Sequence, residues 1–298
     1  MKKLTLASIA ASFAICSGLA TPAMSQETTD AWRGFYFGGY FGAGQGDSKT
    51  NFKDTSTSVS KSTGPDYTST STSTENGWGS ASGTALGAQA DLFVGYNLPV
   101  GSRFLLGVQG EGTPWSTYTQ DSDGRRDSKR TNKYMYTSTV NDNNSSTDSS
   151  TYSQSANFSD DLVAMVALVG RAGVFATPNV LIYGIGGVAA GDFTYSSSSP
   201  SDQNARVLND RQVWANGYTV GGGGEWKVSR AMSIRTEYRF YHFDYDRSQA
   251  SFSSSKSGSN GYSYTYEDNF SRNWTNDVDL HTGKIGVVYQ FCGLMGGC

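Results

Sequence analysis

Apolar and polar residues alternate over much of the chain, most clearly toward its C-terminal end. In residues 232–245, Tyr238 and Phe240 alternate with Arg235 and Arg239. Successive side chains of a β-strand point to opposite faces, whereas a helix would spread the two aromatic rings over both faces. The pattern therefore predicts a strand with one charged face and one aromatic face. Residues 213–227 repeat this scheme, and a tight turn joins the two segments.

Eight segments have this character and are expected to be strands. They are residues 34–44, 86–98, 103–118, 162–175, 180–195, 213–227, 232–245 and 279–291. Long polar stretches and short turns connect them in alternation, and the long ones cover residues 46–83, 119–159, 196–210 and 246–276. Outer-membrane barrels have short periplasmic turns and longer extracellular loops. The sequence therefore predicts an all-β protein, an eight-stranded antiparallel transmembrane β-barrel with four long polar extracellular loops and three short periplasmic turns.

A barrel in lipid inverts the usual placement of side chains. Each predicted strand supplies the roughly 9–11 residues that cross a bilayer, and a closed barrel pairs every backbone group without leaving an edge. The apolar faces then contact lipid and the charged faces line the lumen. The lumen residues inferred in this way are Asp91, Glu111, Arg171, Glu225, Lys227, Arg235, Glu237, Arg239 and Lys284. Eight strands leave an interior that side chains can fill, so we expect these charges to pair as a plug, with Asp91 and Lys227 nearest the rims.

Aromatic residues near the strand ends fit the two girdles that such barrels place at the membrane surfaces. The inner girdle is expected to contain Phe35, Trp226 and Phe291. The outer girdle is expected to contain Trp115, Tyr195, Trp214 and Phe243.

The N-terminus has the order of residues found in a secretory signal peptide. Lys2 and Lys3 precede an apolar run at residues 4–19, and small residues follow up to Ser25. We expect cleavage after Ser25, which leaves residues 26–298 as one barrel domain in the cell outer membrane. Without the two lysines, 21 basic residues remain of 23, against 26 acidic ones, a net charge of −5 that excludes a nucleic-acid footprint. The mature chain keeps Cys292 and Cys298, which could form a disulfide or link to a partner.

Candidate chemistry is sparse. The two histidines, His242 and His281, fall near the outer ends of neighbouring strands, with Asp244 close by, but no spacing singles out a nucleophile beside them. Residues 184–189 match G-x-G-x-x-A, yet no helix follows to receive a dinucleotide phosphate. No cofactor and no metal site are predicted. A basic cluster at residues 121–133 could contact lipopolysaccharide phosphates, other anionic glycans or a host ligand, although interspersed aspartates favour a solvated loop.

Four stretches resemble one known family. Residues 32–39 (WRGFYFGG) resemble the opening strand of the small outer-membrane β-barrel proteins of alphaproteobacteria, often called outer-membrane immunogenic or porin-like proteins. Residues 236–240 (TEYRF) and 281–291 (HTGKIGVVYQF) resemble that family's last two strands, and residues 184–191 its Gly-rich central strand. The family is related in fold to the OmpA-type barrel. The resemblance implies a surface-exposed integral protein, inserted by the barrel assembly machinery among outer-membrane lipids and lipopolysaccharide.

Three functions remain open at this point. The first is a structural and surface-interaction protein that displays Ser/Thr-rich loops and supports envelope integrity. The second is porin-like passive transport of small solutes, and the third is a lipid- or protein-modifying enzyme at the outer rim. A soluble, lipocalin-like barrel is disfavoured because we infer that the aromatic faces point outward and the charged faces point into the lumen, which is the reverse of what a soluble barrel requires.

Overall fold

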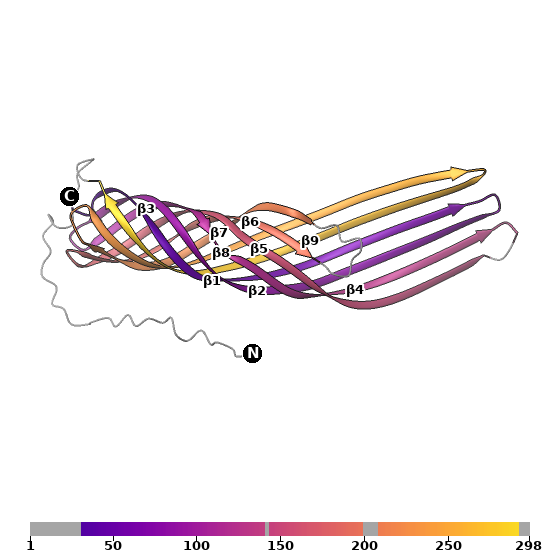
Figure 1. Cartoon of the computed structure of the whole chain (residues 1–298), viewed down its shortest axis with the longest axis horizontal. Helices are drawn as coiled ribbons and strands as arrows, with labels where there is room; N and C mark the ends of the chain where they lie inside the picture. Colours follow the sequence, from indigo (N-terminus) through magenta and orange to yellow (C-terminus); the bar gives the residue numbers. More distant parts are fainter. Residues whose placement is uncertain (1–30, 141–142, 199–207, 292–298) are drawn as a thin grey trace.

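The computed structural model describes residues 31–140, 143–198 and 208–291, and it is entirely β in these ranges (Figure 1). The strands are β1 (Gly34–Thr63), β2 (Tyr67–Val100), β3 (Phe104–Ser116), β4 (Thr119–Ser138), β5 (Asn144–Thr177), β6 (Val180–Ser198), β7 (Leu208–Lys227), β8 (Met232–Ser259) and β9 (Tyr262–Gln290). The predicted signal peptide, residues 1–25, and both Cys292 and Cys298 lie outside the described residues. Among the residues that are described, no helix is long and apolar enough to cross a membrane.

The strands close into a ring. Each pairs antiparallel with its neighbours in the order β1-β9-β8-β7-β6-β5-β3-β2, and β2 pairs again with β1. Strand β4 follows β3 in the same position, between β2 and β5, after a short break at residues 117–118. Pro114, which has no amide hydrogen to donate, lies just before that break. The predicted eight-stranded antiparallel barrel is thus confirmed.

The register sets the width of the barrel. The paired residues that start at Gly46 and pass through β9, β8, β7, β6, β5, β3 and β2 return to β1 at Tyr36, ten residues away. With a rise of about 3.3 Å per residue and strands about 4.8 Å apart, this stagger tilts the strands by about 41°. A barrel of eight strands at this tilt has an interior only wide enough for side chains.

Three of the four polar stretches differ from the prediction. Residues 46–83, 119–159 and 246–276 were expected to be loops, but most of them continue the strands far beyond the barrel (Figure 1). On β1 and β2 the serines at 56, 58, 60 and 62 and at 69, 71 and 73 share the inner face, and mainly threonines occupy the outer face. Alternating small and β-branched residues suit a pleated sheet without an apolar core, because backbone hydrogen bonds hold the strands together.

The turn at the end of β8 shows how these long hairpins close. Asn260 and Gly261 alone connect β8 to β9, and both have positive φ, 52° and 81°. Two residues with positive φ form the type I′ turn whose twist matches paired strands, and Asn-Gly is its preferred sequence.

The six continuing strands form an open, curved sheet, which we call the extension. It contains the outer parts of β5, β4, β2, β1, β9 and β8, in that order. The hairpin of β6 and β7 stops near the middle of the molecule (Figure 1). Within the described residues, the strand pairing of β8 beyond Asp244 is with β9.

Candidate functional site

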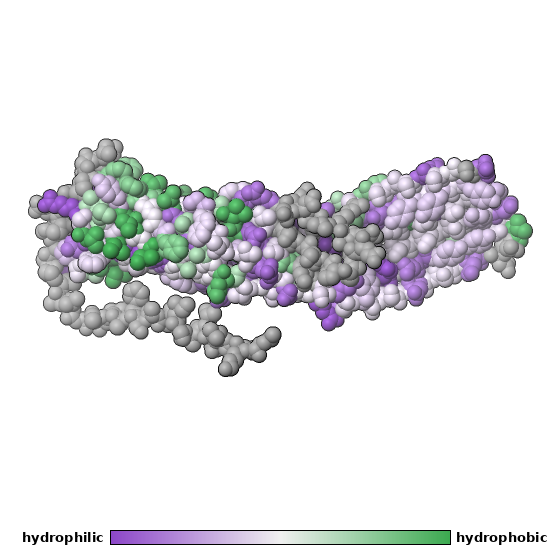
Figure 2. Space-filling view, viewed as in Figure 1, coloured by the Kyte–Doolittle hydropathy of each residue, from purple (hydrophilic) through white to green (hydrophobic). Residues whose placement is uncertain are grey.

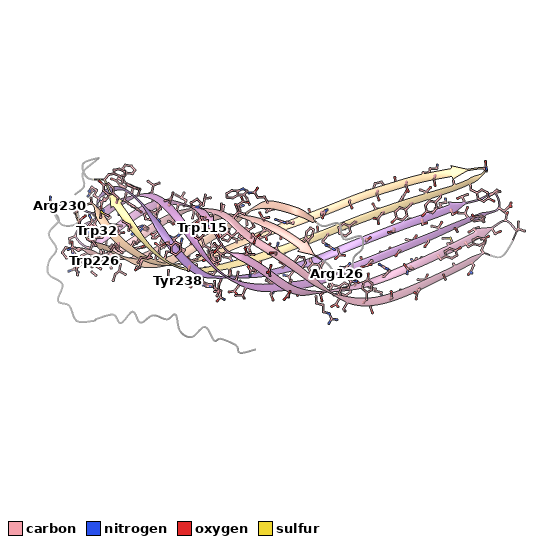
Figure 3. The ribbon with its side chains drawn as sticks, viewed as in Figure 1. Trp32, Trp115, Arg126, Trp226, Arg230 and Tyr238 are labelled. Carbon is pink, nitrogen blue, oxygen red and sulfur yellow. The ribbon has the colours of Figure 1, made fainter. Side chains whose placement is uncertain are left out.

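The outer surface of the barrel is a band of exposed apolar side chains. Leu168, Val108 and Ile285 are 62%, 58% and 57% exposed, and similar residues occupy the outward positions of every barrel strand. The band covers the barrel half of the molecule and gives way to a polar surface over the extension (Figure 2). We call the barrel end with the short β2–β3, β5–β6 and β7–β8 turns the base. Trp226 lies near the base and Trp115 near the start of the extension (Figure 3).

Most residues of the predicted girdles point outward. Phe35, Phe291, Trp115, Trp214 and Trp226 are between 37% and 56% exposed. The side chain of Tyr195 lies outside the described part of the structure, and among the other predicted girdle residues Phe243 is the exception, because it is fully buried and stacks on Tyr241 inside the barrel. It shares the inward face with Tyr241 and Tyr245, so its assignment to the outer girdle was wrong.

The lumen contains the nine charged residues that were inferred from the sequence, each of them buried. In the half nearer the base, Glu225 accepts hydrogen bonds on one carboxylate oxygen from two guanidinium groups. Arg171 Nη2 donates to Glu225 Oε2 at 3.0 Å, and Arg235 Nε donates to the same oxygen at 2.9 Å. The ring of Tyr183 lies under Arg171, 4.1 Å from Cζ to the ring centre. One carboxylate thus joins β5, β7 and β8 across the interior.

A second group of charges lies farther from the base. Arg239 donates to Glu111 at 2.8 Å and also binds Glu237 on its own strand. Lys284 Nζ lies 2.6 Å from Asp91 Oδ2. Asp91 was expected near a rim, but it is 2% exposed and also accepts a hydrogen bond from Thr113 at 2.6 Å. The two groups together contain four acidic and four basic residues, which fill the middle of the lumen: Asp91, Glu111, Glu225, Glu237, Arg171, Arg235, Arg239 and Lys284.

Lys227 is separate from this network. Its Nζ donates to the backbone carbonyls of Ala31 and Arg230, and it lies 5.0 Å from the ring centre of Trp32. Trp32 is fully buried at the base, where its Nε1 donates to the Pro178 carbonyl at 3.1 Å. The two residues close the inner mouth of the barrel.

The sequence reasoning missed the uncharged members of the network. Tyr36 and Tyr40 accept hydrogen bonds from Arg171 and Arg235, respectively, and Gln109 accepts one from Arg235 at 2.8 Å. Tyr241 donates to Glu111 at 3.0 Å. Their inward positions follow from the same period-two pattern, since Tyr36 and Tyr40 share a face with Gly38 and Gly42.

An apolar layer covers the charged groups on the side of the extension. It includes Leu162, Phe193, Phe243 and Leu280, all at most 6% exposed. A cavity of about 20 Å³ remains within it, bordered by Asp160 and Tyr118 on one side. From base to extension the lumen therefore contains a tryptophan cap, a charged section and an apolar section.

The extension has an ionic cluster on its inner face. Arg126 binds Asp54 at 2.5 Å and Glu75 at 2.8 Å, and Arg130 binds Glu75 at 2.7 Å. Burial raises the pKa of the Glu75 carboxyl, but hydrogen bonds from Tyr152 and both arginines outweigh it and hold that pKa below its usual range. Two basic residues of the 121–133 cluster are thus engaged by the chain's own acids (Arg126 in Figure 3).

The histidines lie on the outward face of the barrel wall. His242 Nδ1 is 2.6 Å from Asp279 Oδ1, and its Nε2 is 3.1 Å from Asp244 Oδ1. His281 Nδ1 is 2.7 Å from the Tyr238 hydroxyl. The polar side-chain partners that the structure gives His242 are the carboxylates of Asp279 and Asp244, which can orient an imidazole. The G-x-G-x-x-A match at residues 184–189 lies within β6 and pairs with β5 and β7 as ordinary strand.

Comparisons with known proteins found likeness among solved structures. No family model and no curated protein matches the chain. The chain is similar to the outer membrane protein OprG from Pseudomonas aeruginosa, with 12% identity and a TM-score of 0.34 over 83% of this chain and 96% of that one. It is also similar to Ail, the attachment invasion locus protein of Yersinia pestis (12%, 0.28, 83% and 99%), and to the outer membrane protease OmpT from Escherichia coli (10%, 0.29, 85% and 97%).

Proposed function

We propose that this protein is an integral barrel of the bacterial outer membrane that holds its extension in the space outside the cell. The observation that carries the proposal is the division of the outer surface. Large apolar side chains cover the barrel, while serine, threonine and charged residues cover the extension. In a water-soluble protein, an apolar band around a whole barrel would have to be buried against another protein. In an outer-membrane barrel, the lipid chains bury the band and no partner protein is required.

The filled lumen supports an anchoring role over transport. The charged section contains four acids and four bases, joined by ion pairs of 2.6–3.0 Å and by tyrosine hydroxyls. An ion that passed through would have to displace these pairs and then cross the apolar layer of Leu162, Phe193 and Phe243. Water-filled channels require wider barrels or lumens that side chains leave open. We therefore propose a structural and surface-interaction role in which the extension, rather than flexible loops, is what the cell displays.

Fractionation with surface proteolysis tests the location and the orientation together. The protein should stay in the membrane pellet after a high-salt wash and enter solution only with detergent. Protease added to intact cells should cut within the extension and leave a fragment that contains the barrel. Recovery in the soluble periplasmic fraction without detergent would contradict the proposal.

Planar-bilayer recording separates the anchor from the porin-like alternative. The purified wild-type barrel should show no steady conductance. Replacement of Arg239, Arg235 and Glu225 by alanine, combined with Trp32→Ala, Phe193→Ala and Phe243→Ala to remove the cap and the bulk of the apolar layer, should open a path and give measurable current. Stable open channels in the wild-type protein would favour passive transport instead.

A further inference from the structure

The end of the extension farthest from the barrel has six tyrosines on its inner face, the face that also holds Glu75 (Figure 1). They belong to three successive rows of paired residues, on β4 and β2 at one side and on β9 at the other. Gly64 shows that the two sides share a face, because a Cβ on it would lie 2.5 Å from the ring of Tyr67 and 3.0 Å from that of Tyr262. We call this surface the tyrosine face, and its rings are those of Tyr67, Tyr134, Tyr136, Tyr262, Tyr264 and Tyr266.

Serine hydroxyls form the floor between the tyrosines. In the first row, Ser71 of β2 and Ser60 of β1 separate Tyr134 from Tyr266, and the next row repeats the arrangement. The two tyrosines of such a row are three strand spacings apart, about 14 Å, and the first and third rows are about 13 Å apart. The rings are accessible to a ligand, since Tyr134 is 42% exposed and Tyr264 is 43% exposed.

The stability of the sheet does not account for this one-sided placement. Aromatic residues suit a pleated sheet, but that preference holds for either face of a strand that water reaches on both sides. Over the same rows, the outer face has no aromatic residue in the described chain, and Met135 on it is 58% exposed. Stacking explains the position of two rings, since the centroids of Tyr67 and Tyr136 are 5.9 Å apart. For the other four rings an external partner is the simplest explanation.

The charge of the tyrosine face indicates the class of partner. Within the described residues, its three rows contain serine, asparagine and glycine beside the tyrosines, and no charged side chain. The outer face over the same rows carries Lys61, Lys133 and Lys256. An anionic polymer would find opposite charges on the outer face and none on the tyrosine face. The partner of the tyrosine face is therefore expected to be uncharged.

We propose that the tyrosine face binds a neutral polysaccharide. Aromatic rings pack against the C–H groups on the flat side of a sugar ring, and tyrosine also offers a hydroxyl at its edge. Serine hydroxyls donate and accept hydrogen bonds, as the hydroxyls of a sugar do. The same two residue types give antibody binding sites their rigid contact area and their adaptable hydrogen bonds. Ser60 already donates to the Tyr264 hydroxyl at 3.1 Å, which fixes that ring beside the floor.

The position of the tyrosine face points to a polysaccharide on an opposing surface. On β1 its first row, at Ser60, begins 19 residues beyond Phe41, the outermost large apolar residue of that strand in the band. With a rise of about 3.3 Å per residue and a tilt of about 41°, this is about 47 Å along the barrel axis. If the band lies in the membrane, as the proposed function holds, the face projects well past the lipid headgroups. An opposing surface presents its sugar chains to this end of the molecule first.

Binding by the purified full-length protein in detergent micelles tests the inference. The neutral probes are dextran, laminarin, mannan and galactan, while polygalacturonate is the acidic comparison and carboxymethylated casein is the unfolded polypeptide. We expect a neutral polysaccharide to bind, and a triple variant, Tyr134→Ser, Tyr262→Ser and Tyr264→Ser, to bind it at least about tenfold more weakly. No binding of any neutral probe, or stronger binding of either comparison, would overturn the inference.

Two matched variants separate the loss of the rings from damage to the sheet. Replacement of the same three tyrosines by phenylalanine keeps the rings and should keep most of the binding. Met135→Ser combined with Thr265→Ser changes the outer face of the same strands and should leave binding unchanged. If the inner-face and outer-face serine variants lose binding equally, the tyrosine face is not the site.

Hydroxyl-radical footprinting of the wild-type protein locates the ligand without any substitution. Bound polysaccharide should protect Tyr262, which is 54% exposed, together with Tyr134. Met135 and Trp78, which are 58% and 47% exposed on the outer face, should react as they do in the free protein. Protection of Met135 in place of its neighbour Tyr134 would put the ligand on the opposite face and refute the proposal.

Adhesion of intact cells tests the opposing surface. Cells that display the protein should adhere to beads coated with the bound polysaccharide, and cells with the triple serine variant should not. Tighter binding of lipopolysaccharide purified from those cells would assign the face to the cell's own surface and contradict the opposing one. Binding in micelles needs no membrane location, so a polysaccharide-binding protein found in the soluble fraction would contradict only the outer-membrane role. A membrane-embedded protein that binds no neutral probe would contradict only the proposed binding.

Discussion

Arg239 and Glu111 form a bidentate ion pair across the whole width of the lumen. Arg239 Nη1 lies 2.8 Å from Glu111 Oε1, and Nη2 lies 3.2 Å from Oε2. The two residues come from β8 and β3, which are four positions apart in a ring of eight and therefore diametrically opposite. The planar fork of arginine matches a carboxylate in this geometry, so the pair fixes the distance between opposite walls.

Removal of Arg239 should destabilise the barrel strongly. Arg239→Met leaves Glu111 and Glu237 buried with less compensation, and breaking a buried pair from one side costs about 3–5 kcal/mol. The free energy of unfolding in urea, measured by tryptophan fluorescence in detergent micelles, should fall by about 3 kcal/mol. The control is Arg125→Met, which breaks the exposed pair with Asp127 and should change stability by less than about 1 kcal/mol. Similar losses in the two variants would show that the lumen pair is no more important than a surface pair.

The extension should loosen in acid. The pKa of Glu75 is lowered in the folded chain, so its contribution to stability is present above the unfolded value of about 4.3 and is lost as pH falls through the folded value. Hydrogen exchange should therefore show faster opening of β4 near residues 126–130 at pH 3 than at pH 7. Glu75→Gln should open faster at pH 7 and show a weaker dependence on acid. An identical pH response in that variant would contradict the assignment.

The contribution of Asp160 to folding stability should change with pH in the opposite direction to that of Glu75. Asp160 lies three residues beyond Val163, the outermost exposed apolar residue of β5 in the band, and is 3% exposed. Burial raises the pKa of its carboxyl to about 6, although the Tyr245 hydroxyl lowers it. A raised folded value means that its contribution is present below about pH 4 and is lost as pH rises through 6.

Asp160→Asn should therefore stabilise the protein at pH 8 by on the order of 2 kcal/mol, and the gain should vanish near pH 3.5. Urea unfolding at the two pH values measures the difference. Asp123→Asn, at an exposed position of β4, is the control and should show no such pH-dependent gain. A gain that is equal at both pH values would mean that ionisation of Asp160 is not its source.

A charged substitution should destabilise the protein in the apolar band but not in the extension. Leu168 is 62% exposed and lies about midway between Val163 and Val174, the outermost and innermost exposed apolar residues of β5 in the band. In lipid, Leu168→Arg should cost about 2–4 kcal/mol, as charges at the midplane do. Thr137→Arg, at an exposed position of β4, should be nearly neutral. Refolding into lipid vesicles gives both values, and a small effect of Leu168→Arg would argue against a membrane around the band.

The barrel could be predicted from the sequence because one face of each strand is mostly apolar. Tyr238 and Phe240 flank Arg239, and this alternation favours a two-residue period, while the short turns indicated which strands are neighbours. Which charges would meet could not be predicted in the same way. Arg239 reaches Glu111 because the ten-residue stagger brings β8 and β3 to matching heights, and that stagger is a property of the closed ring.

The extension was missed because its strands have no continuous apolar face beyond the small buried cluster of Phe52, Ala81, Phe158 and Trp274. The alternation of serine and threonine in residues 55–63 and 67–74 was interpreted as loop composition. One local signal was available, since Asn260-Gly261 is the typical sequence of a two-residue hairpin turn. The remaining polar stretch, residues 196–210, contains the end of β6 and the start of β7, and its described residues, 196–198 and 208–210, add no strand to the extension.

The pairing of β1 with β9 has a consequence for how the chain folds. These first and last strands pair without interruption from Tyr36–Gln290 to Thr63–Ser263, which joins residues 200 or more positions apart. Contacts of such long sequence separation form late and slowly, because a large loop must close before they are gained. Much of this seam lies in the extension, outside the apolar band, where water surrounds it. Closure of the ring could thus begin in solution and proceed toward the bilayer, so that hairpin sequences far from the lipid set the rate at which the barrel is completed.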